Sequence, residues 1–239
     1  MLFSTPMVQA ILEGRKSQTR RIMKPQAQAV NTLKERNEAI KRVKGNKLKF
    51  IRTYSGFDYA FPESPYLPGD VLWVRESFLY VLRDHAHDLL EGSRTTNQWV
   101  YAASFHEDWY AYAKSTYGYK WKPGIHMPFE VARLFLRIKS VKYERLQDIL
   151  EADAIAEGIE LGQPWPEAPD RQRYKLYGWK GYNTGAEAYT FEPISSFFSL
   201  WTSINGKDAV VANPWVWAIE FERITKEEAL KVKEASHEG

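Results

Sequence analysis

The stretch EGRKSQTRRIMK, residues 13–24, places five cationic side chains within twelve positions, directly around a glycine. The residues before it read as a short helix, and Gly14 tolerates the left-handed conformation that would end this helix. Residues 17–23 then alternate as a strand does, which would put Thr19 and Arg21 on one face. A solvated basic loop would explain the charge, but it would not explain the order of the residues.

Working outward, the chain contains several short segments that alternate between apolar and polar residues or follow a Pro-Gly turn, and we expect these to be strands. They are residues 71–76, 98–105, 133–146 and 213–224. Residues 148–158 read as a helix that Gly158 ends. Short strands separated by turns, with few helices, predict a mixed α+β fold built on a small β-barrel with peripheral helices and long insertions.

The length of 239 residues suits a single domain, residues 1–239, carrying insertions and a charged tail. The insertions are expected at residues 25–65, 83–118 and 161–194, and the tail at 225–239. Residues 24–52, which overlap the first insertion, hold nine Lys and Arg against two Glu, a net charge of +7. A solvated face is favoured over contact with phosphates. The third insertion is rich in Tyr, Pro and Gly and has no clean period.

Composition excludes several classes of site. The chain has no Cys, which excludes disulfides and thiolate metal sites and suits a reducing cytoplasm. We expect no signal peptide and no membrane span, hence a cytoplasmic protein, with a monomer favoured. Nucleotide-binding glycine loops and the GxSxG elbow are absent. The HAHD stretch at 85–88 is more typical of an exposed loop than of a metal site, so neither metal nor cofactor is expected.

The remaining source of chemistry is the opening stretch. A lysine beside a threonine hydroxyl can act as a base once burial or a neighbouring cation lowers its pKa, and Arg20 and Arg21 supply such neighbours. A carboxylate would still be needed to carry protons. Spacing alone does not select it from the thirty acidic residues.

The pattern G-x-K-x-x-T-x-R, filled by Gly14, Lys16, Thr19 and Arg21, resembles the signature of the ASCH domain family, a relative of the PUA RNA-binding fold. Other segments agree in order: PGDVLWVRESF, KWKPGIHMP, AIAEGI and NPWVWAIEFERI. KWKPGIHMP and NPWVW are similar to the longer ASCH proteins encoded by bacteriophages and prophages. The resemblance covers residues 1–24 and roughly 66–82, 119–160 and 195–224.

This resemblance implies a PUA-like β-barrel with a cleft beside the first helix. Small bacterial members are amidohydrolases that remove the acyl group from acetylated cytidine with a Lys, a Thr and a Glu. Matched by motif, these would be Lys16, Thr19 and Glu157. Other members are described as RNA binders or ribonucleases. A nucleoside or RNA ligand is therefore expected, and a non-catalytic RNA- or base-binding module and a metal-independent ribonuclease stay open as alternatives.

Glu157 stands just before Gly158, where the negative end of a helix disfavours a carboxylate, unless that carboxylate pairs with Lys16. Further candidates for the cleft are the cation Arg21, the pair Arg75 and Glu76, and Trp73. For the pair, an ordinary cross-strand ion pair is the alternative, and for the tryptophan, a core position. In the Tyr-rich insertion, a set of basic and aromatic residues fits stacking on single-stranded nucleic acid. These are Arg171, Arg173, Lys175 and Trp179.

Overall fold

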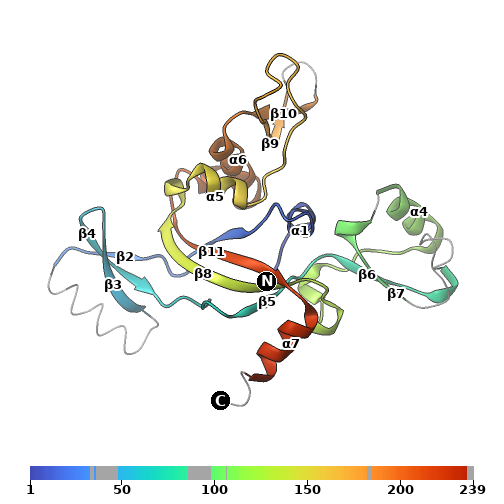
Figure 1. Ribbon diagram of the computed structural model, residues 1–239, viewed down its shortest axis with the longest axis horizontal. Helices are drawn as coiled ribbons and strands as arrows, with labels where there is room; N and C mark the ends of the chain where they lie inside the picture. The colour runs from blue at the N-terminus through green and yellow to red at the C-terminus, as the bar shows by residue number, and fades with distance from the viewer. Residues whose placement is uncertain (33–34, 36–47, 86–97, 106, 182–184, 236–239) are drawn as a thin grey trace. The chain divides into compact units, whose positions relative to one another are not determined.

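The computed structural model describes residues 1–32, 35, 48–85, 98–105, 107–181 and 185–235 (Figure 1). The chain divides into two compact units, each built from separate stretches of sequence. The first unit comprises residues 1–16, 71–137 and 222–239, and the second comprises 17–70 and 138–221. The fold is mixed α and β, as expected. Within the described ranges, no helix combines the length and apolar character needed to cross a membrane.

A four-stranded sheet has the order β1-β11-β8-β5. Its strands are β1 (Gln18–Ile22), β5 (Val71–Trp73), β8 (Phe135–Arg145) and β11 (Trp215–Ile224). β1 pairs antiparallel with β11, and β5 pairs antiparallel with β8. In Figure 1, β8 and β11 are drawn as two long, curved ribbons. These four strands confirm the expected ones, although β5 ends at Trp73, before the charged pair that follows it.

The register of β1 fixes which side chains share a face. Thr19 lies opposite Ile219 and Arg21 opposite Trp217, whereas Arg20 lies opposite Ala218. Because side chains alternate along a strand, Thr19 and Arg21 lie on one face, as predicted, and Arg20 lies on the other.

Helices and a buried apolar cluster complete the core of the second unit. Helix α5 (Glu151–Ala156) packs against α6 (Pro193–Asn205), and α6 also packs against the strand β9 (Tyr174–Lys180). The short 3-10 helix η4 (Leu146–Asp148) lies between β8 and α5, and η5 (Lys207–Ala209) lies between α6 and β11. The cluster between them consists of Leu146, Ile149, Ala154, Ile159, Tyr174, Phe197, Trp201 and Val216.

Residues 25–65 contain a three-stranded sheet of order β2-β4-β3. Its strands are β2 (Gln28–Val30), β3 (Leu48–Tyr54) and β4 (Phe57–Pro62). The rings of Tyr54, Tyr59 and Phe61 surround the buried indole of Trp215, with ring centroids 4.7–5.1 Å from it. Trp215 is therefore a core residue. Most of the basic run, residues 33–34 and 36–47, lies outside the described residues.

The Tyr-rich insertion contains a β-hairpin where the sequence showed no period. Strands β9 (Tyr174–Lys180) and β10 (Glu187–Thr190) pair antiparallel, and their register shifts between Glu187 and Ala188. Gly178 adopts φ +76° within β9. An irregular pairing moves side chains from one face to the other, so the alternation that identifies a strand is lost.

The first unit contains α1 (Thr5–Leu12), β6 (Phe78–Val81), β7 (Gln98–Tyr101), α4 (Glu107–Tyr117) and α7 (Lys226–Ala235). Its 3-10 helices are η1 (Ala102–Ser104), η2 (Gly124–His126) and η3 (Phe129–Val131). The segment 98–105 is a strand only in its first half. The expected charged tail forms the helix α7 through Ala235.

Candidate functional site

Glu157 is held at the end of α5, beside β1. It caps the helix, and its backbone N–H donates to the carbonyl of Asp153. Gly158 follows with φ +82°, a conformation that ends the helix at this point. The N–H of Ser17 donates to the carbonyl of Ala156 at 2.9 Å, which joins the start of β1 to the end of α5. The Glu157 carboxylate is thereby buried next to the strand that carries the K-x-x-T motif.

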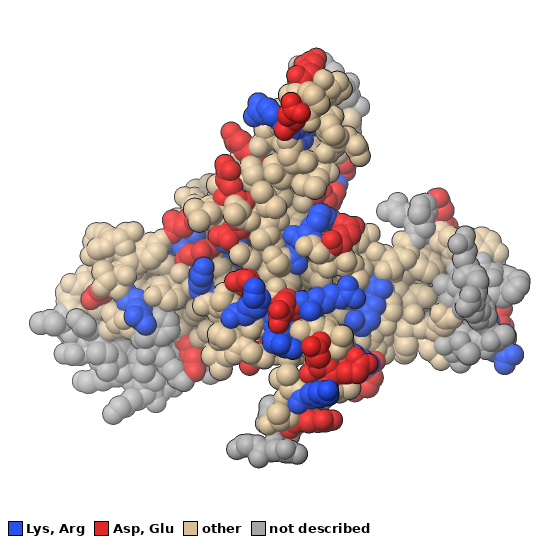
Figure 2. All heavy atoms as spheres, in the orientation of Figure 1, with Lys and Arg blue, Asp and Glu red and all other residues tan. Residues whose placement is uncertain are grey.

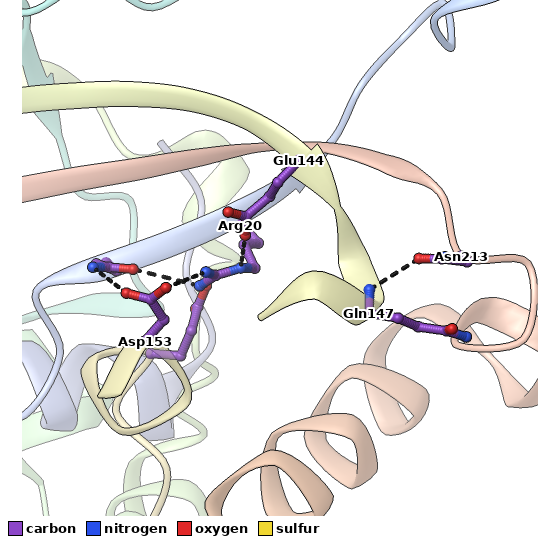
Figure 3. A network of polar contacts seen from close by, with 7 residues as sticks. Arg20, Glu144, Gln147, Asp153 and Asn213 are labelled. Atoms are coloured by element: carbon purple, nitrogen blue, oxygen red, sulfur yellow. Dashed lines mark hydrogen bonds and ion pairs between the residues drawn. The ribbon is translucent and has the colours of Figure 1, made fainter. Parts of the chain in front are cut away.

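Arg20 connects Glu157 to two further carboxylates (Figure 3). Its Nε donates to Glu144 Oε1 at 2.7 Å, and its Nη1 donates to Glu157 Oε1 at 3.2 Å. Its Nη2 lies 3.3 Å from Asp153 Oδ2, while Gln18 Nε2 donates to Asp153 Oδ1 at 2.9 Å. The side chain of Arg20 is only 1% exposed. One guanidinium thus orients acidic groups from β8, from α5 and from the end of α5.

Glu157 also interacts electrostatically with Arg21. Burial is the largest influence on Arg21 and lowers the pKa of its guanidinium, whereas the nearby Glu157 and Tyr66 act in the opposite direction. An arginine remains charged at neutral pH. Glu157 therefore interacts with two arginines that project from opposite faces of β1.

A hollow opens on the Arg20 face of the second unit, with about 250 Å³ of empty space, part of it open to solvent. It is lined by Gln18, Arg20, Ser140, Lys142, Glu144, Asp153, Ala218 and Glu220. Thr19 does not line it, because Thr19 projects from the other face of β1. This hollow is consequently a different feature from the cleft that the ASCH resemblance implies.

The two motif residues Lys16 and Thr19 are both withdrawn from water, at 3% and 2% exposure. The backbone N–H of Lys16 donates to the carbonyl of Ala10, and its Nζ lies 5.9 Å from the centroid of the Phe3 ring. Lys16 belongs to the first unit, and Thr19 and Glu157 belong to the second. The pairing of Lys16 with Glu157 stays a prediction.

Arg75 and Glu76 do not form the ion pair considered from the sequence. Both oxygens of Glu76 accept hydrogen bonds from Arg133, from Nε at 2.8 Å and from Nη2 at 2.9 Å. The Arg133 guanidinium also lies over the ring of Tyr101. Arg75 instead stacks on Trp73, with its Cζ 4.4 Å from the ring centroid. Arg133 lies 57 positions from Glu76, so no local pattern indicated it.

The cations of the Tyr-rich insertion contact groups within that insertion or just before it. Arg171 stacks on Phe191, and Arg173 lies near the rings of Trp165 and Tyr189 while donating to the Gln163 carbonyl. Both arginines therefore already have partners within the insertion, which weakens their assignment as phosphate contacts.

Lys175 forms ion pairs with Glu187 at 2.7 Å and Glu160 at 3.0 Å. Burial lowers the pKa of Lys175, but hydrogen bonds to the two carboxylates outweigh burial and raise it. Trp179 differs from these residues, because its side chain is 65% exposed.

No group of three or more His, Asp or Glu side chains within the described stretches is arranged to hold a metal ion. His85 stacks on Tyr117 and lies 2.9 Å from the Tyr119 hydroxyl, while the remainder of HAHD lies outside the described residues. No protein-family model, curated protein or solved structure matches this chain.

Sequence reasoning treated Arg20 only as a neighbouring charge and missed both Glu144 and Asp153. Asp153 had a usable signal, since it lies four positions before Glu157 and this spacing places both on one side of a helix. Glu144 carries no comparable sequence signal, because its partner Arg20 is 124 positions away.

Proposed function

We propose that this protein is an ASCH-type hydrolase that cleaves the amide of an acylated pyrimidine nucleoside or nucleotide, such as N4-acetylcytidine. One observation carries the proposal: the three residues matched by motif are all withdrawn from water. Lys16, Thr19 and Glu157 are 3%, 2% and 3% exposed. Lys and Glu are rarely buried so completely unless they are paired, because removing a charge from water is costly.

In this proposal, water adds to the amide carbonyl carbon, the C–N bond breaks, and a carboxylic acid and the free amine of the base are released. Lys16 acts as the base, and the Thr19 hydroxyl either orients this water or attacks the carbonyl first, which releases the amine and leaves an ester on Thr19 that water then hydrolyses to the acid. Glu157 carries the proton to the leaving nitrogen. Arg21 stabilises the negative charge that develops on the carbonyl oxygen.

An assay with N4-acetylcytidine tests the proposal. We expect Lys16→Ala and Glu157→Gln each to lower turnover by about 100-fold or more, the range for loss of a general acid or base. Lys24→Ala is the matched control, because Lys24 is an exposed lysine just after β1. Absence of turnover by the wild type on a panel of acylated nucleosides would reject this substrate class.

A second candidate is a module that binds RNA or a modified base without chemistry. The exposed indole of Trp179, followed by the exposed Lys180 at the end of β9, favours it, since exposed aromatics stack on bases. On the face shown in Figure 2, however, basic and acidic side chains lie interspersed. Several surface cations are also ion-paired, as Lys139 is with Glu220 at 2.8 Å. Binding of single-stranded RNA that is insensitive to salt would reject this candidate, because phosphate contacts release counterions.

A further inference from the structure

Arg75 is held in a fixed position by its backbone. Its N–H donates to the carbonyl of Met1 at 2.8 Å, and its carbonyl accepts from the N–H of Phe3 at 3.3 Å. Gly124 packs so closely that a Cβ at that position would lie 2.9 Å from the Arg75 carbonyl oxygen. These contacts surround the residue just beyond β5 and fix the point from which its side chain projects.

The guanidinium also lies against an aromatic ring. Cζ of Arg75 lies 4.4 Å from the centroid of the Trp73 ring, and Trp73 meets Phe129 edge-on at 5.9 Å. Stacking on an aromatic ring covers one side of a guanidinium and leaves its edge, which carries the N–H groups, able to donate.

Despite this fixed position, the Arg75 side chain has no hydrogen-bond or ion-pair partner among the described residues, and its Nε is buried. Buried donors are normally satisfied, and each exception needs an explanation. The adjacent Glu76 is not a partner for the Arg75 side chain, because both of its carboxylate oxygens accept hydrogen bonds from Arg133.

A second cation, Lys16, lies near Phe3, a residue that is hydrogen-bonded to the backbone of Arg75. Phe3 donates its N–H to the carbonyl of Arg75, and the Nζ of Lys16 lies over the Phe3 ring at 5.9 Å. A guanidinium edge binds two oxygens of an oxyanion at once. A phosphate group supplies up to two negative charges and three terminal oxygens, which is enough to accept hydrogen bonds from more than one N–H of a guanidinium.

We propose that the edge of the Arg75 guanidinium, held against Trp73, is a binding site for a phosphate group. This inference goes beyond the proposed hydrolase activity, because it concerns the recognition of an anion and holds whether or not an amide is cleaved. The phosphate could belong to a mononucleotide or to a nucleic-acid backbone, and the experiment separates these two sources.

The test is an NMR titration of the ¹⁵N-labelled full chain with inorganic phosphate. We expect saturable shifts of the Arg75 Nε–H resonance in the wild type, and binding weaker by about tenfold or more in Arg75→Gln. Arg75→Lys should bind with intermediate affinity, because it keeps the charge and loses the fork. Arg15→Gln is the matched control, since Arg15 is already ion-paired with Glu13 at 2.6 Å and should bind as the wild type does.

Two further arms identify the source of the phosphate. Tighter binding of cytidine 5′-monophosphate than of a cytidine dinucleotide assigns the site to a terminal phosphate, and the reverse assigns it to a backbone. Non-saturable shifts, equal affinity for acetate, or unchanged affinity in Arg75→Gln would overturn the proposal. If Arg75→Gln fails to fold, the proposal is still tested by the phosphate affinity of Arg75→Lys and by whether the wild-type Arg75 Nε–H resonance shifts saturably.

Discussion

Arg20 and Arg75 are two arginines with opposite surroundings. Arg20 has Glu144, Asp153 and Glu157 around it, and its side chain is almost completely buried. Arg75 has one aromatic ring against it and a buried Nε without a partner. A guanidinium that is ion-paired with three carboxylates of its own chain holds the fold and its neighbours in place. One that is oriented but unsatisfied is suited to an external anion.

Removing Arg20 should have the largest effect on stability. Arg20→Gln leaves three carboxylates close together without their cation, and loss of one partner from a buried ion pair costs about 3–5 kcal/mol. For a chain of this size, we expect the midpoint of thermal unfolding to fall by about 6–20 °C. Arg20→Lys should lose less, because it keeps the charge. A melting temperature of Arg20→Gln equal to that of the wild type would remove the distinction between the two arginines.

A double-mutant cycle between Arg20→Gln and Glu157→Gln should show an intermediate effect. Because the two side chains share a buried hydrogen bond, their destabilisations should be non-additive by about 1–3 kcal/mol. The measurement is urea unfolding of the wild type, both single variants and the double variant. Combining Arg20→Gln with Glu76→Gln provides the control, which should be additive, since Glu76 pairs with Arg133 instead. Additivity of the first pair would show that Arg20 does not hold Glu157.

The hairpin of β9 and β10 should respond to pH through a smaller effect. Hydrogen bonds from Lys175 and Tyr189 lower the pKa of Glu187, so its stabilising contribution is present above the unfolded carboxyl pKa, about 4.3, and is lost as the pH falls through the lower folded value. Lys175 has a raised pKa, so its contribution is complete below about pH 10 and is lost on further alkalinisation.

The protection factors of the β9 and β10 amides, which correct for the pH dependence of intrinsic exchange, should therefore fall only a few-fold below about pH 4, because the pair is partly exposed. Lys175→Met should remove most of this acid dependence, and Lys180→Met should reduce it less, because the charge of Lys180 acts on Glu187 without a hydrogen bond. An acid response that survives in Lys175→Met would assign it to another group.

Replacing Arg75 should have the smallest effect on stability. Arg75→Gln removes no hydrogen bond or ion pair to the described residues, so its free energy of unfolding should stay within about 1 kcal/mol of the wild type, the size of its stacking on Trp73. Urea unfolding alongside Arg20→Gln measures the contrast directly. A loss as large as that of Arg20→Gln would mean that Arg75 serves the fold.

The contrast between the two arginines also marks what the sequence could predict. The alternation of residues 17–23 predicted that Thr19 and Arg21 share a face, and Gly158 predicted the end of α5, because both depend on neighbouring residues. The partners of Arg20 lie 124 to 137 positions away, and only the completed sheet and helix select them from the other acidic residues.

Other features could not be predicted from the sequence pattern, either because strand pairing is irregular or because the partners lie far apart in the chain. The register shift at Glu187 and Ala188 removed the period of the β9–β10 hairpin. The ion pair of Glu76 with Arg133 has no local signature either. The sequence identified Arg75 as a candidate, but the absence of a partner for its side chain is a property of the folded chain alone.

The pairing of β1 with β11 has a consequence for synthesis of the protein. Gln18 pairs with Glu220, so the strand that carries Thr19, Arg20 and Arg21 must wait for nearly the whole chain before it gains its neighbour. At translation rates of about 5–20 residues per second, roughly 200 residues take about 10–40 s to emerge from the ribosome. During that interval the basic stretch is exposed to whatever binds cations in the cell. The candidate site is thus among the last parts of the molecule to be completed.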